Sequence, residues 1–265
     1  KSIRAYLMLV LASIFWAGNF IVGKFAFFED IPPFSLVFFR WLTVWFILLP
    51  FTYKEILNNK NNIFNNFSLL LFLGLTSVGL FNSFVYISLN YTQVINASLF
   101  NTAIPAAIIL FCFLFKIENT NSYQLVGLII SVIGVFAIIT RLDLNILLTL
   151  SFNIGDIWMI CAVFCWGIYS AFLKKLKLKI SLLSLVHIFC SCGLIFLFPQ
   201  FLYEYSQSDI INVDKNFLYC LVYLALFPSI GSYYCWTGAV SIIGPNRAGI
   251  FLMLIPMFSA VMAIF

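Results

Sequence analysis

Nine apolar segments, each long enough to cross a lipid bilayer, occupy nearly the whole of this 265-residue chain. A spanning helix needs about 20 predominantly apolar residues. We therefore expect transmembrane helices at residues 5–27, 34–53, 67–89, 93–115, 121–140, 154–174, 181–203, 217–240 and 244–265. Charged residues make up only 9% of the chain, whereas a soluble domain carries about 25%. The composition excludes a soluble globular protein and predicts an all-α membrane protein, a polytopic helical bundle.

The chain also repeats itself at an offset of about 150 residues. Trp16 returns as Trp166, and Pro105 returns as Pro256. Because the repeated unit holds an odd number of spans, its two copies cross the membrane in opposite directions. We predict two inverted five-helix repeats, the architecture of secondary transporters. The first repeat covers residues 1–140, the connection 141–153 and the second repeat 154–265.

The second repeat has no segment that corresponds to residues 116–140, and the chain begins with Lys1 rather than Met. We therefore expect a fragment of a ten-span protein, with nine spans present and the last helix of the second repeat missing. A natural nine-span protein is the alternative.

Lysine and arginine residues predict the orientation. With the N-terminus in the cytoplasm, the inner segments carry nine of them and the outer segments carry three. The inner ones are Lys1, Arg4, Lys54, Lys60, Lys116, Lys174, Lys175, Lys177 and Lys179, and the outer ones are Lys24, Arg141 and Lys215. Because positive loops stay inside, we predict a multi-pass plasma (inner) membrane protein with a cytoplasmic N-terminus. The net charge of +5 reflects this bias and not nucleic-acid binding.

Several short motifs occur along the chain in a characteristic order and spacing. They are Trp16-Ala17-Gly18-Asn19-Phe20 with Lys24, Arg40 after Pro32-Pro33, Tyr86-Ile87-Ser88-Leu89, Ala97 with Pro105, and in the second half Trp166, Gly244, Arg247, Ala248 and Pro256. Together they resemble the drug/metabolite transporter (DMT) superfamily, specifically its ten-span members with two EamA-type domains. The resemblance implies a transporter of a small metabolite or drug-like molecule, such as an amino acid or nucleobase, and we predict an exporter.

Pro105 and Pro256 lie at matched positions in the fourth and ninth predicted spans. Each proline removes a helical hydrogen bond. Interrupted helices at corresponding positions of two repeats indicate a substrate site near the bilayer midplane. A packing kink is the alternative role of each proline.

Polar side chains inside the spans add to this prediction, because in hydrocarbon they face a partner or a wet cavity. We expect a substrate cavity lined by Trp16, Asn19, Asn82, Tyr86, Asn101, Trp166, Tyr169, Tyr233, Trp236 and Thr237. For each amide, an interhelical hydrogen bond is the alternative role.

Three cations are candidate anchors for an anionic substrate, namely Lys24, Arg40 and Arg247. For Arg40 we favour a structural ion pair with Glu29 or Asp30. For Arg247 we favour snorkelling to lipid headgroups, because it lies near the end of a span.

The sequence favours transport by alternating access over the other functions considered. It has one histidine, His187, and no paired carboxylates within a span, which argues against an enzyme. No predicted span carries a central Asp or Glu, which argues against proton antiport. The seven cysteines all lie in predicted spans, so no disulfide, metal or cofactor is expected. A passive channel, or a lipid flippase or scramblase, is the alternative function. The expected partners are a small-molecule substrate and the lipid bilayer, and a homodimer stays open.

Overall fold

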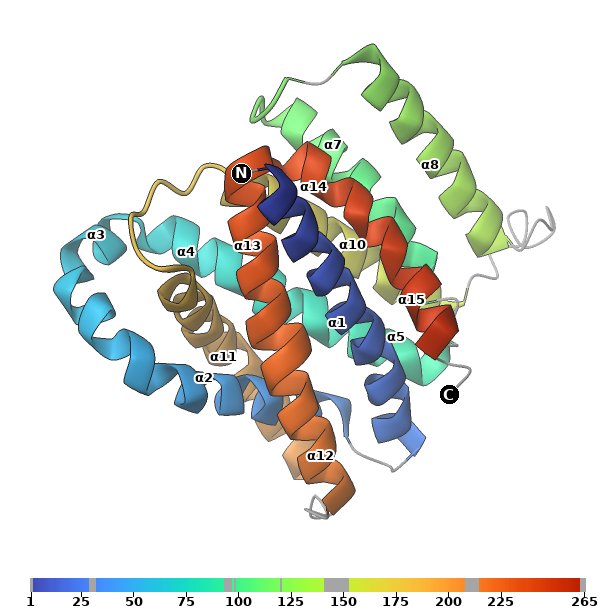
Figure 1. Cartoon of the computed structure of the whole chain (residues 1–265). Helices are drawn as coiled ribbons and strands as arrows, with labels where there is room; N and C mark the ends of the chain where they lie inside the picture. Colours follow the sequence, from blue (N-terminus) through green and yellow to red (C-terminus); the bar gives the residue numbers. More distant parts are fainter. Residues whose placement is uncertain are drawn as a thin grey trace.

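The computed structural model describes residues 2–28, 32–92, 97, 99–119, 121–140, 153–207 and 215–262, and every described element is a helix (Figure 1). The first half contains α1 (Ser2–Phe28), α2 (Pro33–Asn58), α3 (Lys60–Asn65), α4 (Phe67–Gly74), η1 (Leu75–Leu80), α5 (Phe81–Tyr91), η2 (Asn101–Ala103), α7 (Ile104–Leu114) and α8 (Ser122–Thr140). The second half contains α10 (Ile154–Leu173), α11 (Leu182–Gln207), α12 (Lys215–Leu224), η3 (Ala225–Gly231), α13 (Ser232–Ile243), α14 (Pro245–Gly249), η4 (Ile250–Met253) and α15 (Leu254–Met262).

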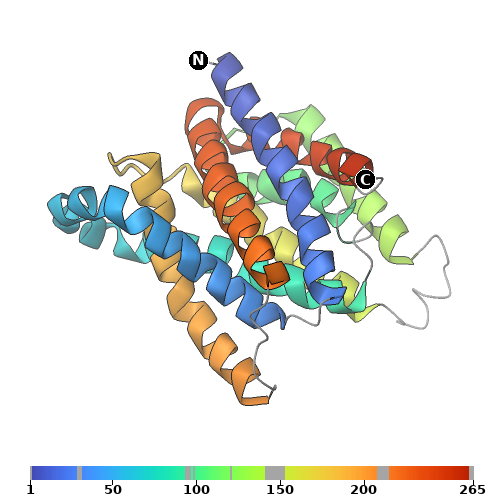
Figure 2. The same cartoon turned by 60° about the horizontal axis from the view of Figure 1, so that its bottom comes forward.

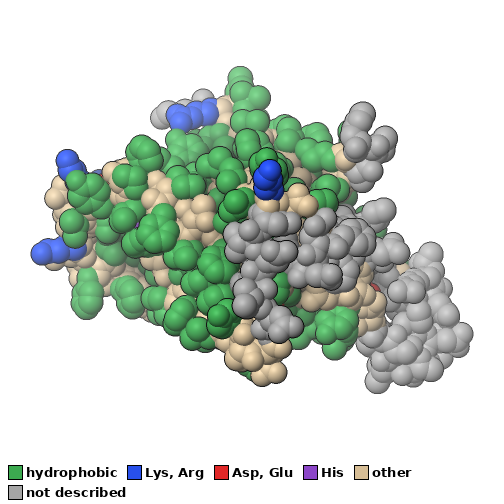
Figure 3. Space-filling model, turned by 90° about the horizontal axis from the view of Figure 1, so that it is seen from below, with side chains coloured by type: hydrophobic (Ala, Val, Ile, Leu, Met, Phe, Trp, Pro, Cys, Tyr) green, Lys and Arg blue, Asp and Glu red, His purple; other side chains and the backbone are tan. Residues whose placement is uncertain are grey.

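Seven continuous helical stretches are long and apolar enough to cross a membrane. They are Ser2–Gly23, Pro33–Asn58, Phe67–Tyr91, Ile154–Leu173, Leu182–Gln207, Lys215–Ile243 and Pro245–Met262, and Asn101–Leu114 is a shorter apolar helix. Seen from below, hydrophobic side chains cover much of the described surface, and few Lys and Arg side chains are in view (Figure 3). Such an apolar exterior suits contact with lipid. The predicted class, an all-helical multi-pass membrane protein, is confirmed.

Two of the helices extend beyond their predicted ends. We expected helices at 34–53 and 181–203, whereas α2 continues to Asn58 and α11 to Gln207. The added turns are polar, so hydropathy alone does not detect them. Each added turn carries a glutamate, Glu55 or Glu204, that contacts the other helix.

The helices predicted at 67–89 and 217–240 each contain a π-helical segment at its centre, η1 and η3. These two segments begin 150 residues apart, at Leu75 and Ala225. In η3, Pro228 has no N–H to donate to the Leu224 carbonyl four residues earlier. The Ser229 hydroxyl donates to that carbonyl instead, at 2.7 Å. A single π-helical turn inside an α-helix is frequently found at functional sites.

Pro105 and Pro256 lie in the first turns of α7 and α15, directly after the 3₁₀ segments η2 and η4. A proline in the first helical turn lacks only an N–H that would have no intrahelical partner. The α-helix is therefore interrupted just before each proline, at matched positions in the two halves.

The two halves of the chain interlock. Helix α1 packs against α13 and α15, and its counterpart α10 packs against α5 and α7. Figures 1 and 2 both show α1 beside α13, although these helices are far apart in sequence. Helix α8 lies at the edge of the bundle against α7 and η2. The core therefore lies between the halves and not within each one.

Helices α2 and α11 lie side by side and cap each other at opposite ends. At the C-terminal end of α2, the Glu55 carboxylate accepts hydrogen bonds from Ser181 N at 2.8 Å and from the Ser184 hydroxyl at 2.5 Å. At the C-terminal end of α11, Glu204 accepts from Ser35 N at 2.6 Å and from the Ser35 hydroxyl at 2.6 Å. Helices that cap each other in this way run antiparallel.

The reciprocal caps also follow the sequence repeat. Glu55 and Glu204 are 149 residues apart, and so are Ser35 and Ser184. A carboxylate at a helix N-terminus satisfies free N–H groups and interacts favourably with the helix dipole. The same stabilising contact therefore occurs once at each end of the α2–α11 pair.

Candidate functional site

A central pocket lies where the two halves meet. It is lined by Trp16, Asn19, Phe20, Phe81, Asn82, Val85, Asn101, Ile104, Trp166, Leu252 and Ile255. These residues come from α1, α5, the 3₁₀ segments η2 and η4, and helices α7, α10 and α15. The 3₁₀ breaks therefore place their side chains at the pocket.

Aromatic rings pack edge to face around this pocket. The Trp16 and Trp166 rings lie 5.1 Å apart at an interplanar angle of 84°. Tyr233 contacts the Trp166 ring at 5.4 Å, and Trp236 contacts the Trp16 ring at 5.7 Å. Such geometry is favourable for aromatic pairs. The matched tryptophans of the two repeats thus meet at the centre of the molecule.

Arg40 lies behind the pocket and is 1% exposed. Its Nη1 donates to Asn19 Oδ1 at 2.9 Å, to Tyr86 Oη at 3.2 Å and to Asn82 Oδ1 at 3.3 Å. Its Nε donates to Ser229 Oγ at 2.6 Å. Arg40 therefore ties α1, α2, α5 and η3 together. Among the residues that the structure describes, all of these hydrogen-bond acceptors are uncharged.

Two buried donors at the pocket have no partner among the described residues. They are Asn101 Nδ2 and Trp166 Nε1, and the two side chains are 1% and 2% exposed. An unmade hydrogen bond of a buried polar group costs about 1–3 kcal/mol. Each such group in a folded protein calls for an explanation, for example a ligand or a water molecule.

The pocket is nearly closed. The space in it that a water molecule can occupy is about 20 Å³, which is enough for about one water molecule. A metabolite can enter only if the surrounding helices move apart. Among the residues that the structure describes, the centre of the bundle is therefore occluded.

Half of the predicted cavity residues line this pocket, and the other half lie around it. Trp16, Asn19, Asn82, Asn101 and Trp166 belong to its wall. Tyr86 holds Arg40, and Tyr169 Oη lies 3.4 Å from Thr237 Oγ1. Tyr233 donates to the Ser77 carbonyl at 2.8 Å. These three tyrosines are therefore engaged with the protein itself.

The three predicted anion anchors do not gather at one place. Arg40 lies at the centre, whereas Arg247 is exposed and lies on α14, away from it. The Lys24 side chain lies outside the described residues, and so do Glu29 and Asp30, the carboxylates expected to pair with Arg40. The seven cysteines are free, and no group of metal-ligating side chains occurs in the described part of the chain.

Ser229 was not among the predicted site residues, although it holds Arg40. Its place next to Pro228 was the only signal in the sequence. The aliphatic wall, made by Val85, Leu252 and Ile255 among others, was also not predicted. Such residues do not differ in type from the rest of a membrane helix.

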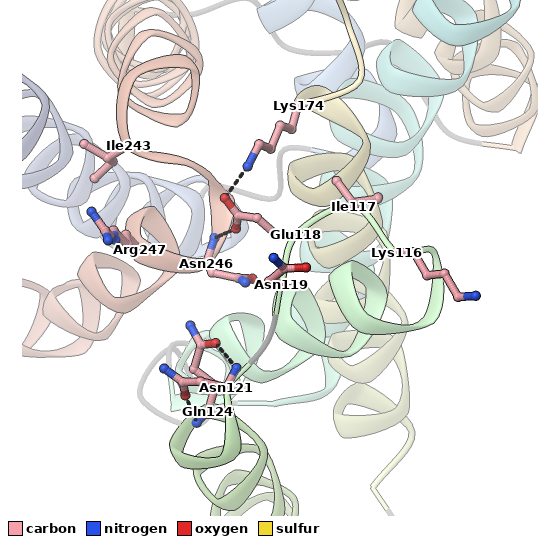
Figure 4. Close-up of a pocket in the computed structure, with 10 residues that line it drawn as sticks. All are labelled: Lys116, Ile117, Glu118, Asn119, Asn121, Gln124, Lys174, Ile243, Asn246 and Arg247. Atoms are coloured by element: carbon pink, nitrogen blue, oxygen red, sulfur yellow. Dashed lines mark hydrogen bonds and ion pairs between the residues drawn. The ribbon is translucent and has the colours of Figure 1, made fainter.

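A second, polar pocket of about 550 Å³ lies at the end of the molecule where α10 ends and α14 begins (Figure 4). Glu118 bridges the two halves there. Its Oε1 accepts from Lys174 Nζ at 2.5 Å, and its Oε2 accepts from Asn246 N at 3.2 Å. Lys116 and Arg247 lie on opposite sides of this pocket (Figure 4). Glu118 thus joins the α7–α8 connection to the second half.

Comparison with known proteins agrees with this arrangement in two halves. The sequence profile of the EamA-like transporter family matches residues 3–140 and 153–265. An uncharacterized transporter of Archaeoglobus fulgidus is 27% identical over 265 residues, which cover 99% of this chain and 89% of the relative. The uncharacterized transporter YyaM of Bacillus subtilis is 22% identical over 263 residues, 99% of this chain and 86% of the relative. YetK of B. subtilis, also an uncharacterized transporter, is 25% identical over 274 residues, 99% of this chain and 79% of the relative. The predicted resemblance is thereby confirmed, and the chain belongs to the EamA-like transporter family.

Proposed function

We propose that this chain is a secondary transporter that moves a small organic molecule across the membrane by alternating access. Its two halves act as inverted repeats that rock about the central pocket, and each repeat contributes five spans in a ten-span protein. The N-terminus lies in the cytoplasm, and we expect transport to run outward. The substrate binds between the tryptophans of the two halves.

The reciprocal capping of α2 and α11 carries this proposal. The two helices occupy corresponding places in the repeats and run antiparallel, as inverted repeats require. Each end of the pair is closed by one glutamate and the serine-bearing first turn of the other helix. Opening at either end breaks the same kind of contact, so the two open states are close in energy. A carrier needs two exchangeable states of this kind.

The closed centre supports the same mechanism. Space for about one water molecule is too little for a continuous pore. A substrate can reach the Trp16–Trp166 pair only when one end opens. This occluded centre favours a carrier over a passive channel, and it gives a phospholipid headgroup no open path.

Transport by purified protein in proteoliposomes tests the proposal. Vesicles are exposed to a defined mixture of amino acids, nucleobases and organic acids, and uptake is followed by mass spectrometry. For the compound taken up, we expect a rate that saturates with concentration and that rises when unlabelled compound is loaded on the opposite side. Asn101→Leu, in the central pocket, should reduce this rate, whereas Phe164→Ala on the exposed surface of α10 should not.

Two outcomes contradict the carrier. A rate that grows linearly with concentration, without stimulation from the opposite side, indicates a channel. Redistribution of a fluorescent phospholipid between leaflets, abolished by Asn101→Leu, indicates a scramblase.

A further inference from the structure

We propose that the central pocket binds an oxyanion, a carboxylate or phosphate group on an apolar body, by the unpartnered donors of Asn101 and Trp166 under the charge of Arg40. This inference names the substrate class and rests on the proposed function of the pocket as the transport site.

The charge is that of Arg40. A guanidinium stays protonated in proteins, and burying it in a membrane bundle is costly unless an anion compensates it. Within the described part of the chain, its hydrogen-bond partners are two amide oxygens and two hydroxyls, none of which carries charge. These contacts engage its Nε and Nη1 and, among the described residues, bring no negative charge to it. The site therefore favours an anion near it.

The hydrogen bonds around Arg40 also decide which atoms face the pocket. Asn19 and Asn82 both line the pocket, and both turn their Oδ1 atoms toward Arg40. Asn82 Nδ2 is engaged with the Ser77 and Val78 carbonyls at 2.9 and 3.0 Å. The acceptors of these amides are thus taken, and Asn19 keeps its Nδ2 as a donor.

The unpartnered groups at the pocket are donors as well. Asn101 Nδ2 comes from the first half and Trp166 Nε1 from the second, and both are buried without a partner among the described residues. An oxyanion is the ligand that accepts hydrogen bonds from several N–H groups at once and also compensates a positive charge. An ammonium group would leave both donors unmade and would face Arg40 with like charge.

The rest of the wall is apolar and fits the body of such a ligand. Rings of Trp16, Phe20 and Phe81 and the aliphatic side chains of Ile104 and Ile255 surround the pocket. Burying apolar surface contributes about 25 cal/mol per Å². The substrate class is therefore an organic anion with an apolar or aromatic part, and not a bare inorganic ion or a sugar.

The size of the charge effect follows from the layer between Arg40 and the pocket. The side-chain amides of Asn19 and Asn82 separate the Arg40 guanidinium from the pocket. We take the distance from the guanidinium to a bound oxyanion as about 7 Å and the effective dielectric constant as about 20. A unit charge at that distance changes the affinity for a monovalent anion about 50-fold. Arg40 is in this sense a positioning residue, since the hydrogen bonds to the ligand come from the neutral donors.

Binding measurements on the purified protein in nanodiscs test the inference, with tryptophan fluorescence as the readout. The probes are phenylacetate, phenyl phosphate, the neutral isostere phenylacetamide and the cation phenethylammonium. We expect at least one of the two anions to bind about 50-fold more tightly than phenylacetamide, and phenethylammonium to bind least. The stronger of the two anions tells whether the group is a carboxylate or a phosphate.

Variants test whether the charge of Arg40 determines the affinity for anions, independently of its role in holding the helices together. Arg40→Gln should bring anion and amide to within a few-fold of each other, and Arg40→Lys should retain the preference for the anion. Because Arg40 ties four elements together, Arg40→Gln can also unfold the protein. Asn101→Asp therefore serves as the second variant, since it places a carboxylate at the site and should lower anion affinity at least tenfold more than it lowers the affinity for the amide. Arg247→Gln, on the exposed face of α14, should change nothing.

The inference is overturned if no anion binds, if phenylacetamide or phenethylammonium binds as tightly as the anions, or if Asn101→Asp leaves the anion preference intact. A pocket that prefers the neutral amide still allows a carrier. Conversely, anion binding without saturable flux in proteoliposomes overturns the carrier and leaves the anion site standing. The two failures are therefore distinguishable.

Discussion

Removing one glutamate cap at a time should open the two ends of the molecule separately. Glu55→Ala removes the acceptor of three hydrogen bonds at the N-terminus of α11, from Ser181 N at 2.8 Å, from the Ser181 hydroxyl at 2.5 Å and from the Ser184 hydroxyl at 2.5 Å. Glu204→Ala removes the corresponding contacts at the N-terminus of α2. The two variants delete equivalent contacts at opposite ends.

The magnitude follows from helix capping. Loss of an N-terminal capping acceptor costs about 1 kcal/mol, and loss of a negative charge at a helix N-terminus costs up to about 1 kcal/mol more. In the proposed mechanism the contact exists only when that end is closed, so each substitution should favour the state open at that end by about 2 kcal/mol. This corresponds to about a 30-fold change in the equilibrium between the states.

The assay is alkylation of a cysteine in the central pocket by a membrane-impermeant maleimide. Phe81→Cys, in a background without the seven native cysteines, reports access from each side of oriented vesicles. Glu55→Ala should raise the rate from the cytoplasmic side about 30-fold, and Glu204→Ala should raise it from the opposite side. Tyr203→Ala, at an exposed position beside Glu204, is the matched control and should raise neither rate.

The reasoning is refuted if both glutamate variants increase access from the same side. It is also refuted if neither variant changes access although both proteins fold, since the caps would then carry no part of the closed state.

Four further substitutions test the packing, each by the midpoint of unfolding in detergent. Lys116 lies just past the C-terminal end of α7 and has a φ of 50°. This conformation costs a non-glycine residue about 1–2 kcal/mol, so Lys116→Gly should raise the midpoint. A Cβ at Gly74 would lie 2.7 Å from the Phe189 carbonyl oxygen, so Gly74→Val should cost about 1–3 kcal/mol. Gly127→Ala, with open space around it inside α8, should not lower the midpoint. Glu118→Ala removes a partly exposed ion pair and should cost less than about 1 kcal/mol, and a cost well above this would show that Glu118 holds the halves together.

The repeat and the apolar segments predict most of the fold, because both are properties of residue type and spacing. The matched tryptophans Trp16 and Trp166 were expected at the cavity, and the structure brings their rings together. Asn19, Asn82 and Asn101 were chosen because amides are costly in hydrocarbon, and all three line the pocket. Whether these residues bind substrate stays a prediction.

Other features of the fold and the site depend on which helices pack against each other. The spacing of residues in the sequence does not reveal this packing. The contact of Arg40 with Ser229 joins positions 189 residues apart, and it exists because η3 packs against α2. The π-helical segments could not be predicted, since they depend on side chains that bond freed carbonyls, as Ser229 does. The reciprocal caps could have been predicted from the sequence, because Glu55 and Glu204 are separated by the offset of the repeat. Counting charges on each side of the membrane does not reveal this match.

Locking one end of the molecule and measuring the other tests the alternating-access claim most directly. Cysteines at Ser35 and Glu204, whose side chains touch, are joined by a short bifunctional thiol reagent, which holds closed the end that we propose faces away from the cytoplasm. Spin labels at Asn58 and Lys177 then report the distance across the other end, which we propose faces the cytoplasm. Alternating access predicts that this distance distribution shifts to longer values, because only the cytoplasmic end can still open. An unchanged or shorter distribution after cross-linking would contradict the account.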